Sequence, residues 1–349
     1  MDWKRAGLFA LSTAIILGMI YFADFQEFIS TVQDADKIIL ASAIFVGLLN
    51  LPIWANSWYK LINRVRGNIS FFKALRMFTA GNFLNSVTPL GQFGGEPLMA
   101  YVIKKNTDLE YEEGLSAVVS ADIINAIPIF TFILGGSAYL LFFNSLNSVL
   151  LEMSYIALVI MVLGGSIAYL LWFRSGFIES KIIFIVRLLS RPFGEESSLV
   201  EKIEEKIEGM QETFKTVGEE PKELLKISIV AHLFFVCQVI SLYLVMLSVG
   251  VDTDLTPLYF VLPTAALANF SPTPGGSGTY ELILAGVLTA FIGVPKETAV
   301  TIAILYRFTT FWPSIGLGYI SLLSLSDIDL SKISSFSENP KNQQEVKDK

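Results

Sequence analysis

Residues Thr88–Pro97 read TPLGQFGGEP, in which prolines, three glycines and a glutamate interrupt an otherwise apolar sequence. A second stretch, TPGGSGTYE at Thr273–Glu281, superposes on it without a gap when the chain is shifted by 185 residues. Between Ser86 and Pro128, nine of 43 positions are identical to their counterparts, and chance would give roughly a third of that at average residue usage. The chain therefore contains an internal duplication.

The duplication matches residues that shape the backbone or carry charge. It also places Asp122 of the first copy on Arg307 of the second, each inside an apolar segment. This exchange of sign at matched depth makes the two residues the candidate functional centre. The other matched pairs are Pro89 with Pro274, Gly91 with Gly276, Glu96 with Glu281, Ala100 with Ala285, Val102 with Val287, Glu112 with Glu297, and Pro128 with Pro313.

The composition indicates a protein that crosses a membrane several times. Of 349 residues, 53% are hydrophobic and 16% are charged, which is too little charge for a soluble surface. The net charge of -7 argues against nucleic acid as a partner. The single Cys237 and the single His232 exclude a disulfide framework and a cysteine or histidine metal cluster, so we expect no metal and no cofactor.

Hydropathy predicts an all-α fold with six spanning helices. Residues 174–223 are expected to form cytoplasmic amphipathic helices, and residues 327–349 a polar, disordered tail. Pro52 is expected to kink or relieve the second span. The predicted spans are residues 6–23, 38–59, 114–143, 154–173, 224–247 and 298–323.

Two further pairs of apolar segments are too short to cross the bilayer. Segments 71–87 and 97–103 flank the first glycine-rich stretch, and segments 256–270 and 280–292 flank the second. Because a spanning helix needs about 20 residues, each pair is predicted to form a re-entrant helical hairpin that enters and leaves on one side. Open backbone is tolerable at that depth where protein or a wet cavity satisfies it. The predicted turn residues are Pro89, Gly91, Gly94, Gly95, Pro274, Gly275, Gly276 and Gly278.

The placement of lysine and arginine predicts that both termini are cytoplasmic. In this orientation 22 of the 25 basic residues lie in cytoplasmic segments, Lys37 and Lys296 lie outside, and Arg307 lies within the membrane. The hairpin that begins unit 71–128 then opens to the cytoplasm, and the hairpin that begins unit 256–313 opens to the outside. The two units form an inverted-topology repeat, a geometry by which transporters expose one central site to alternate faces.

The four charged residues near the hairpins have two interpretations each. Asp122 and Arg307 either form a structural ion pair that locks two spans, or Arg307 binds a phosphate through its planar, doubly donating guanidinium. Glu96 and Glu281 either offset the dipole at a helix amino terminus or line a cavity between the hairpin tips. In that cavity they would bind protons or a cationic headgroup.

Polar side chains gather near the same hairpin tips and are candidates for the lining of a substrate cavity. Some of them alternatively hydrogen-bond across helices. The glycines likewise break a helix for steric reasons and leave N–H groups that suit an anion. The polar set is Asn82, Asn85, Asn125, Asn269, Ser271, Thr273 and Tyr280.

The sequence GGSG at residues 275–278 formally matches the G-x-S-G of rhomboid-type intramembrane serine proteases, with Ser277 as the nucleophile. Two features argue against this interpretation. His232 lies upstream on the cytoplasmic side, and the residue that duplicates Ser277 is Gln92. We therefore expect a protein that is not an enzyme, with a hydrolase acting through Ser277 as the alternative.

Four motifs are the most specific features of the chain. They are TPLGQFGGEPLMAY at residues 88–101, Ser120-Ala121-Asp122, FSPTPGGSGTYE at residues 270–281, and Leu305-Tyr306-Arg307 followed by Pro313. With these motifs the chain resembles the lysylphosphatidylglycerol synthase/flippase transmembrane-domain family over residues 6–325. That family is a group of flippase-like integral membrane proteins.

The resemblance implies that the protein moves an anionic or glycosylated lipid between membrane leaflets. We expect this movement to take place in the plasma membrane, and the inverted repeat predicts that it occurs by alternating access. Full synthases of the family add a soluble aminoacyl-transfer domain, and other members add a glycosyltransferase domain. Neither is expected here, so only the translocation activity is carried over. A carrier for a soluble organic anion is a further alternative, and no residue pattern specifies an oligomeric state.

Overall fold

The computed structural model describes residues 25–66, 68–87, 92–143, 148–174, 198–266 and 273–325, together with Lys181, Ala268 and Ser271. These residues form α-helices and 3-10 turns, and no strand lies among them, which confirms the predicted all-α class. The elements are α2 (Phe25–Asp34), α3 (Lys37–Leu48), α4 (Asn50–Val65), α5 (Phe71–Val87), α6 (Gln92–Asn106), α7 (Tyr111–Phe143), α8 (Ser148–Phe173), α10 (Ser198–Gly218), α11 (Pro221–Ser248), α12 (Leu258–Ala266), the 3-10 turn η3 (Pro274–Gly276), α13 (Thr279–Ile292) and α14 (Lys296–Ser324).

Four described segments are long and apolar enough to cross a membrane: 37–65, 111–136, 221–248 and 274–292. The last of these joins η3 to α13 across Gly278, whose φ is positive, and α13 itself has 14 residues, about 21 Å of helix. The protein is therefore a multi-pass integral membrane protein.

The total of six spans and the re-entrant character of the two hairpins stay predictions. The predicted span at 6–23 and the predicted tail at 327–349 lie outside the described residues. So do residues 175–197 of the predicted amphipathic region 174–223, apart from Lys181.

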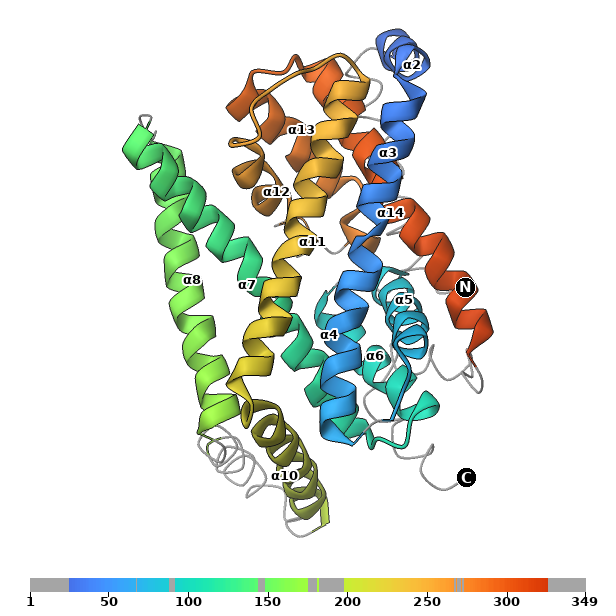
Figure 1. The fold of residues 1–349 in the computed structure, drawn as a ribbon, viewed down its shortest axis with the longest axis vertical. Coiled ribbons are helices and arrows are strands. Elements are labelled where there is room, and N and C mark those ends of the chain that lie inside the picture. The colour runs from blue at the N-terminus through green and yellow to red at the C-terminus, as the bar shows by residue number, and fades with distance from the viewer. Residues whose placement is uncertain are drawn as a thin grey trace.

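The helices repeat in the order that the duplication predicts, with α5, α6 and α7 corresponding to α12, α13 and α14. Helix α7 begins at Tyr111 and α14 begins at Lys296, two residues that are matched by the shift of 185 positions. Each helix contains the matched proline, Pro128 or Pro313. In Figure 1, α5 and α6 lie in the lower half of the molecule, α12 and α13 lie in the upper half, and α7 and α14 run in opposite directions.

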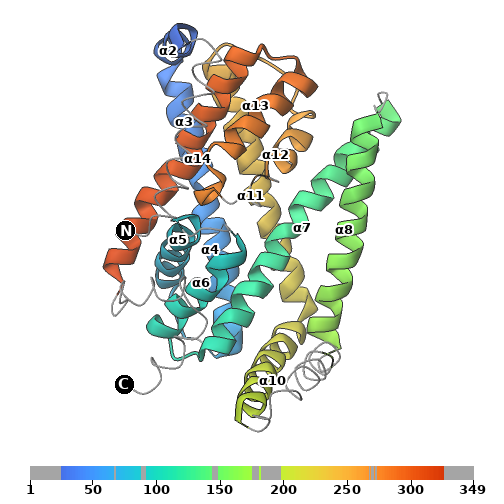
Figure 2. The ribbon, with the colours of Figure 1, turned by 180° about the vertical axis from the view of Figure 1, so that it is seen from behind.

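Each long helix of a repeat packs on the short first helix of the other repeat. Helix α14 packs against α5, as Figure 2 shows, and α7 packs against α12. The α14–α5 contact is close because a Cβ atom at Gly318 would lie 2.5 Å from the Thr79 carbonyl oxygen. Thr79 Oγ1 also donates a hydrogen bond to Ser321 Oγ at 2.8 Å. The two repeats are therefore interlocked.

The second predicted span consists of two helices, α3 and α4, with a break at Leu49. Pro52 accounts for the break because it has no N–H for the Leu48 carbonyl oxygen, and its ring crowds that oxygen. The kink therefore lies three residues before the proline. It places Asn50 at the first position of α4, a position that matters for the site described below.

Helix α6 begins earlier than predicted. It covers Gln92–Asn106, so that Gly94 and Gly95, predicted as turn residues, lie within the helix, and Glu96 is not at its start. Pro97 lies inside α6 as its sixth residue. At that position it removes one helical hydrogen bond, the bond to the carbonyl of Phe93 four residues earlier, close to the helix start.

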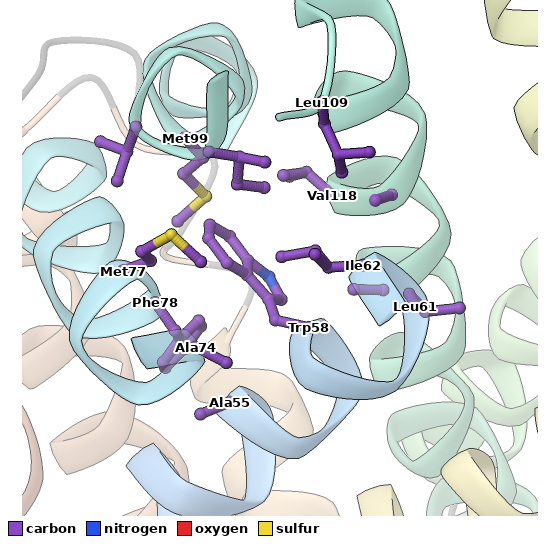
Figure 3. Packing of buried hydrophobic residues seen from close by; sticks show 14 of the residues in the cluster. Ala55, Trp58, Leu61, Ile62, Ala74, Met77, Phe78, Met99, Leu109 and Val118 are labelled. Atoms are coloured by element: carbon purple, nitrogen blue, oxygen red, sulfur yellow. The ribbon is translucent and has the colours of Figure 1, made fainter. Parts of the chain in front are cut away.

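Two apolar cores hold the helices together. The first joins α4, α5, α6 and α7 around Trp58, whose side chain is fully buried, and Figure 3 shows its indole among Met77, Met99 and Val118. The second joins α11, α12, α13 and α14 around Tyr306 and Leu288. Residues of both cores line one cavity, which therefore lies between them.

Candidate functional site

Arg307 of α14 is the most strongly held polar residue of the site. Its side chain is buried, with 6% of the residue exposed. Nε donates a hydrogen bond to Glu281 Oε1 at 3.2 Å, and Nη2 donates to the Gly275 carbonyl oxygen at 2.8 Å and to Ser277 Oγ at 3.2 Å. All three partners belong to η3 or the residues that follow it, so the second glycine-rich stretch wraps around the guanidinium.

The glycines of this stretch make that wrapping possible. Gly275, Gly276 and Gly278 all have positive φ, at 57°, 67° and 82°, a conformation that residues with a Cβ atom rarely adopt. At Gly275 a Cβ atom would also lie 2.3 Å from the Phe311 ring. The predicted role of these residues as turn residues is consistent with this backbone.

Aromatic rings complete the environment of Arg307. Its guanidinium carbon lies 3.5 Å from the centroid of the Phe311 ring and 5.0 Å from the centroid of the Tyr280 ring. A cation over an aromatic face is attracted by the negative face of the ring. The charge of Arg307 is thus held by a carboxylate, a carbonyl, a hydroxyl and two rings.

Glu281 has two roles, because its two carboxylate oxygens have different partners. It is 1% exposed, and Oε2 accepts a hydrogen bond from the Gly278 N–H at 2.7 Å, which caps α13 at its third residue. Oε1 accepts from Arg307. Glu281 therefore caps the amino terminus of α13 and holds Arg307, but it is not among the residues that line the cavity.

The direct Asp122–Arg307 ion pair, one of the two interpretations of that pair, is wrong. The ion pair of Arg307 is with Glu281, and among the described residues none is made by Asp122. The physical reason is proximity along the chain: the positive-φ turn at Gly275–Gly278 brings Glu281 against the helix that follows it. Asp122 lies on α7 and contributes to the same cavity without this partner.

That cavity has a volume of about 350 Å³ and is lined by residues of both repeats. Of the predicted site residues, it brings together those on α5, α6, α7, α13 and α14, with two glycines of η3. Glu281 pairs with Arg307 and is not among the lining residues. Asn269, Pro89 and Gly91 are outside the described residues. The predicted residues that line the cavity are Asn82, Asn85, Glu96, Asp122, Asn125, Gly275, Gly276, Tyr280 and Arg307.

Two amide side chains in the cavity wall were not predicted. Asn50 lies at the break between α3 and α4, and Gln238 lies in α11. Each is an amide inside a long apolar segment, and a polar side chain at such depth is by itself a signal of function. This signal is present in the sequence for both residues.

Several buried amide atoms of the cavity wall have no hydrogen-bond partner. They are the oxygen atoms Oδ1 of Asn50, Oδ1 of Asn85 and Oε1 of Gln238, and the nitrogen Nδ2 of Asn125. Asn125 is 2% exposed, and its own Oδ1 accepts from Ser57 Oγ at 2.9 Å. Because buried polar groups in folded proteins are almost always paired, these four atoms make the cavity a candidate binding site.

The geometry does not assemble a hydrolytic centre around Ser277. Its Oγ accepts from Arg307, which cannot act as a base. His232 instead donates from Nδ1 to the Ser228 carbonyl oxygen at 2.7 Å, and its Nε2 lies 2.9 Å from Thr131 Oγ1. Within the described residues no group of three or more potential metal ligands occurs either.

Fold and cavity together define a multi-pass, all-α membrane protein in which two duplicated halves enclose a polar site. The chain belongs to the lysylphosphatidylglycerol synthase TM region family, whose model matches residues 9–318. It is 26% identical over 328 residues to a UPF0104 membrane protein of Pyrococcus horikoshii, and this alignment covers 92% of this chain and 97% of the relative.

A UPF0104 membrane protein of Methanothermobacter thermautotrophicus is 29% identical over 332 residues, covering 91% of this chain and 92% of the relative. One of Methanocaldococcus jannaschii is 24% identical over 335 residues, covering 94% and 97%. No solved structure matches the chain.

Proposed function

We propose that this protein is a lipid flippase, which moves the headgroup of an anionic or glycosylated lipid between the two leaflets by alternating access. The observation that carries the proposal is Arg307, a cation held at the wall of a polar cavity between the two repeats of an apolar helical protein. A headgroup that crosses a bilayer needs such a polar environment in place of water. Membership in a family named for a lipid synthase adds support.

Arg307 is suited to bind a phosphate oxygen. Its hydrogen bonds to described residues use Nε and Nη2, which leaves Nη1 for a ligand. Fixed donors of this kind bind phosphate in proteins. The unpartnered amides of Asn50, Asn85 and Gln238 would contact hydroxyl groups of the headgroup.

The proposal includes an orientation in the plasma membrane with both termini cytoplasmic, supported by the lysine and arginine distribution. Cysteine introduced at Asn144 or Thr253 should then be labelled by an impermeant reagent from outside, and cysteine at Ser197 should not. Labelling of Ser197 from outside would contradict the inverted repeat.

Translocation is tested in proteoliposomes that contain phosphatidylglycerol with a fluorescent headgroup, by the fraction that external dithionite quenches. We expect the wild-type protein to expose the inner-leaflet label and Arg307→Gln to abolish this exposure. Arg64→Gln is the matched control, because Arg64 lies at the end of α4, away from the cavity, and pairs with Glu220. Peptide hydrolysis, or uptake of a soluble anion without lipid movement, would overturn the proposal.

A further inference from the structure

The charges around the cavity do not balance. Arg307 is neutralised by Glu281, with which it forms an ion pair at 3.2 Å. Glu96 of α6 and Asp122 of α7 also line the cavity, and neither has an ion-pair partner among the described residues. Two carboxylates therefore face one small space without a cation of their own, and a charge at such depth is costly.

The uncharged groups of the wall add to this excess of acceptors. The unpartnered oxygens of Asn50, Asn85 and Gln238 are buried and can only accept hydrogen bonds. Ionised Glu96 and Asp122 are also acceptors only, whereas a protonated carboxyl has one O–H to donate. A proton on either residue therefore adds one donor to this wall. The unpartnered groups of the wall that can donate are Nδ2 of Asn125 and the hydroxyl of Tyr306.

We infer that Glu96 and Asp122 form a proton-binding pair, and that an anionic headgroup enters the cavity together with a proton. This inference rests on the proposed lipid translocation and adds its driving ion. A phosphate placed beside two ionised carboxylates is repelled by both, and one proton removes one of those repulsions. A singly charged lipid anion that moves with one proton carries no net charge across the membrane.

No other group of the wall takes this role. The remaining titratable residues that line the cavity are Tyr280, Tyr306 and Arg307. Helices α4, α5 and α12 contribute only amides, a hydroxyl and apolar side chains to it. His232 of α11 contacts α7 through Thr131 outside the cavity wall.

The test uses the full-length protein in proteoliposomes with a pH difference of one unit and a clamped membrane potential. We expect labelled phosphatidylglycerol to leave the leaflet on the acidic side and reach about a tenfold excess on the other, because one coupled proton supplies a tenfold ratio per pH unit. Changing the potential at equal pH should leave the distribution unchanged. Uncoupled movement of an anion would instead respond by about 2.3 kcal/mol per 100 mV.

Variants separate the pair from the rest of the site. Asp122→Asn and Glu96→Gln should lose the pH-driven excess, because a neutral amide resembles a permanently protonated carboxyl and takes up no proton with the lipid. Asp254→Asn, at an exposed position outside the cavity, should keep the excess. In detergent, short-chain phosphatidylglycerol should cause uptake of about one proton per protein, and neither cavity variant should show it.

The outcomes distinguish the two proposals. Translocation that proceeds without a response to the pH difference overturns proton coupling and leaves the flippase intact. A requirement for sodium ions, or a lipid that accumulates only when it carries an amine, also overturns proton coupling. Absence of translocation at every pH overturns both. Proton uptake in detergent needs no transport, so it decides the inference even for a variant that reconstitutes poorly.

Discussion

The two repeats have the same backbone plan but different electrostatics. In the second repeat, Glu281 caps α13 and pairs with Arg307, so both charges are buried with partners. In the first repeat, the matched residues are Glu96 and Asp122, which line the cavity with no ion pair among the described residues. The second half thus holds its two charges as a buried pair, with Nη1 of Arg307 left for a ligand, and the first half presents two unpaired carboxylates to the cavity. The exchange of Asp122 for Arg307 at matched positions is one source of this difference between the halves.

The two halves also differ in whether an aromatic ring lies beside the charged residue. Phe311 lies four residues after Arg307 and stacks on its guanidinium. The residue matched to Phe311 is Ala126, four residues after Asp122, and it lines the cavity. A small side chain there leaves room beside the carboxylate, where a ring would cover it. The second half therefore holds the fixed positive charge of Arg307. The first half leaves space beside the carboxylate of Asp122, whose charge can be titrated or screened.

The largest expected effect separates Glu281 from its counterpart Glu96. Glu281→Gln leaves the Arg307 charge buried without its carboxylate, which should lower the free energy of unfolding by about 3–5 kcal/mol. Glu96→Gln removes no ion pair, and we expect it to change that free energy by less than about 1 kcal/mol. Unfolding in one detergent measures both. The double variant Glu281→Gln/Arg307→Gln should recover much of the loss, and equal effects of the two single variants would erase the contrast between the repeats.

A smaller effect is expected at the turn that wraps Arg307. Gly275→Ala places a Cβ atom against the Phe311 ring and forces a residue with a side chain into positive φ, at a cost of about 1–3 kcal/mol. Gly286→Ala is the matched control, since a Cβ atom at that position of α13 meets nothing within 4 Å. It should be neutral or slightly stabilising. A tolerated Gly275→Ala would show that the turn does not hold the guanidinium.

The ring contact comes next. Phe311→Leu keeps an apolar side chain but removes the aromatic face from Arg307, which should cost about 1–2 kcal/mol. Phe308→Leu, on the exposed side of the same helix, is the control and should be close to neutral. If both variants lower the free energy of unfolding by the same amount, the loss reflects the general packing of α14, and the stacking of Phe311 on Arg307 adds no stability of its own.

The smallest effect is expected at Ser277. Ser277→Ala removes one hydrogen bond from Arg307 and should lower stability by about 0.5–1.5 kcal/mol. We expect lipid translocation to stay within about twofold of wild type, because Gly275 and Glu281 still hold the guanidinium. Loss of activity in a stably folded Ser277→Ala protein would revive the hydrolase alternative.

Much of the architecture could be predicted because it depends on local pattern. The shift of 185 residues predicted that α7 and α14 correspond, and their first residues match in that shift. Helix α5 has the predicted bounds because apolar sequence ends at the first proline-rich turn. The start of α6 was predicted too late, because proline favours a first turn, whereas α6 accommodates Pro97 as its sixth residue with the loss of one hydrogen bond.

The ion-pair partner of Arg307 could not be predicted, because it depends on the conformation of a turn that the sequence does not specify directly. Matched depth indicated Asp122, whereas the positive-φ turn brought Glu281 to the guanidinium. Depth along a helix does not specify which neighbour a flexible side chain meets. Asn50 and Gln238 were within reach of prediction, because an amide inside an apolar span is unusual on its own.

The contact between α5 and α14 also sets an order of events during biosynthesis. Thr79 meets Ser321, which lies 242 residues later. A ribosome that adds about 5–20 residues per second delivers it roughly 12–50 s afterwards. Throughout that interval α5 sits in the bilayer with its partner surface uncovered. A stop codon within α14 should therefore yield a chain that the cell degrades, rather than one working half.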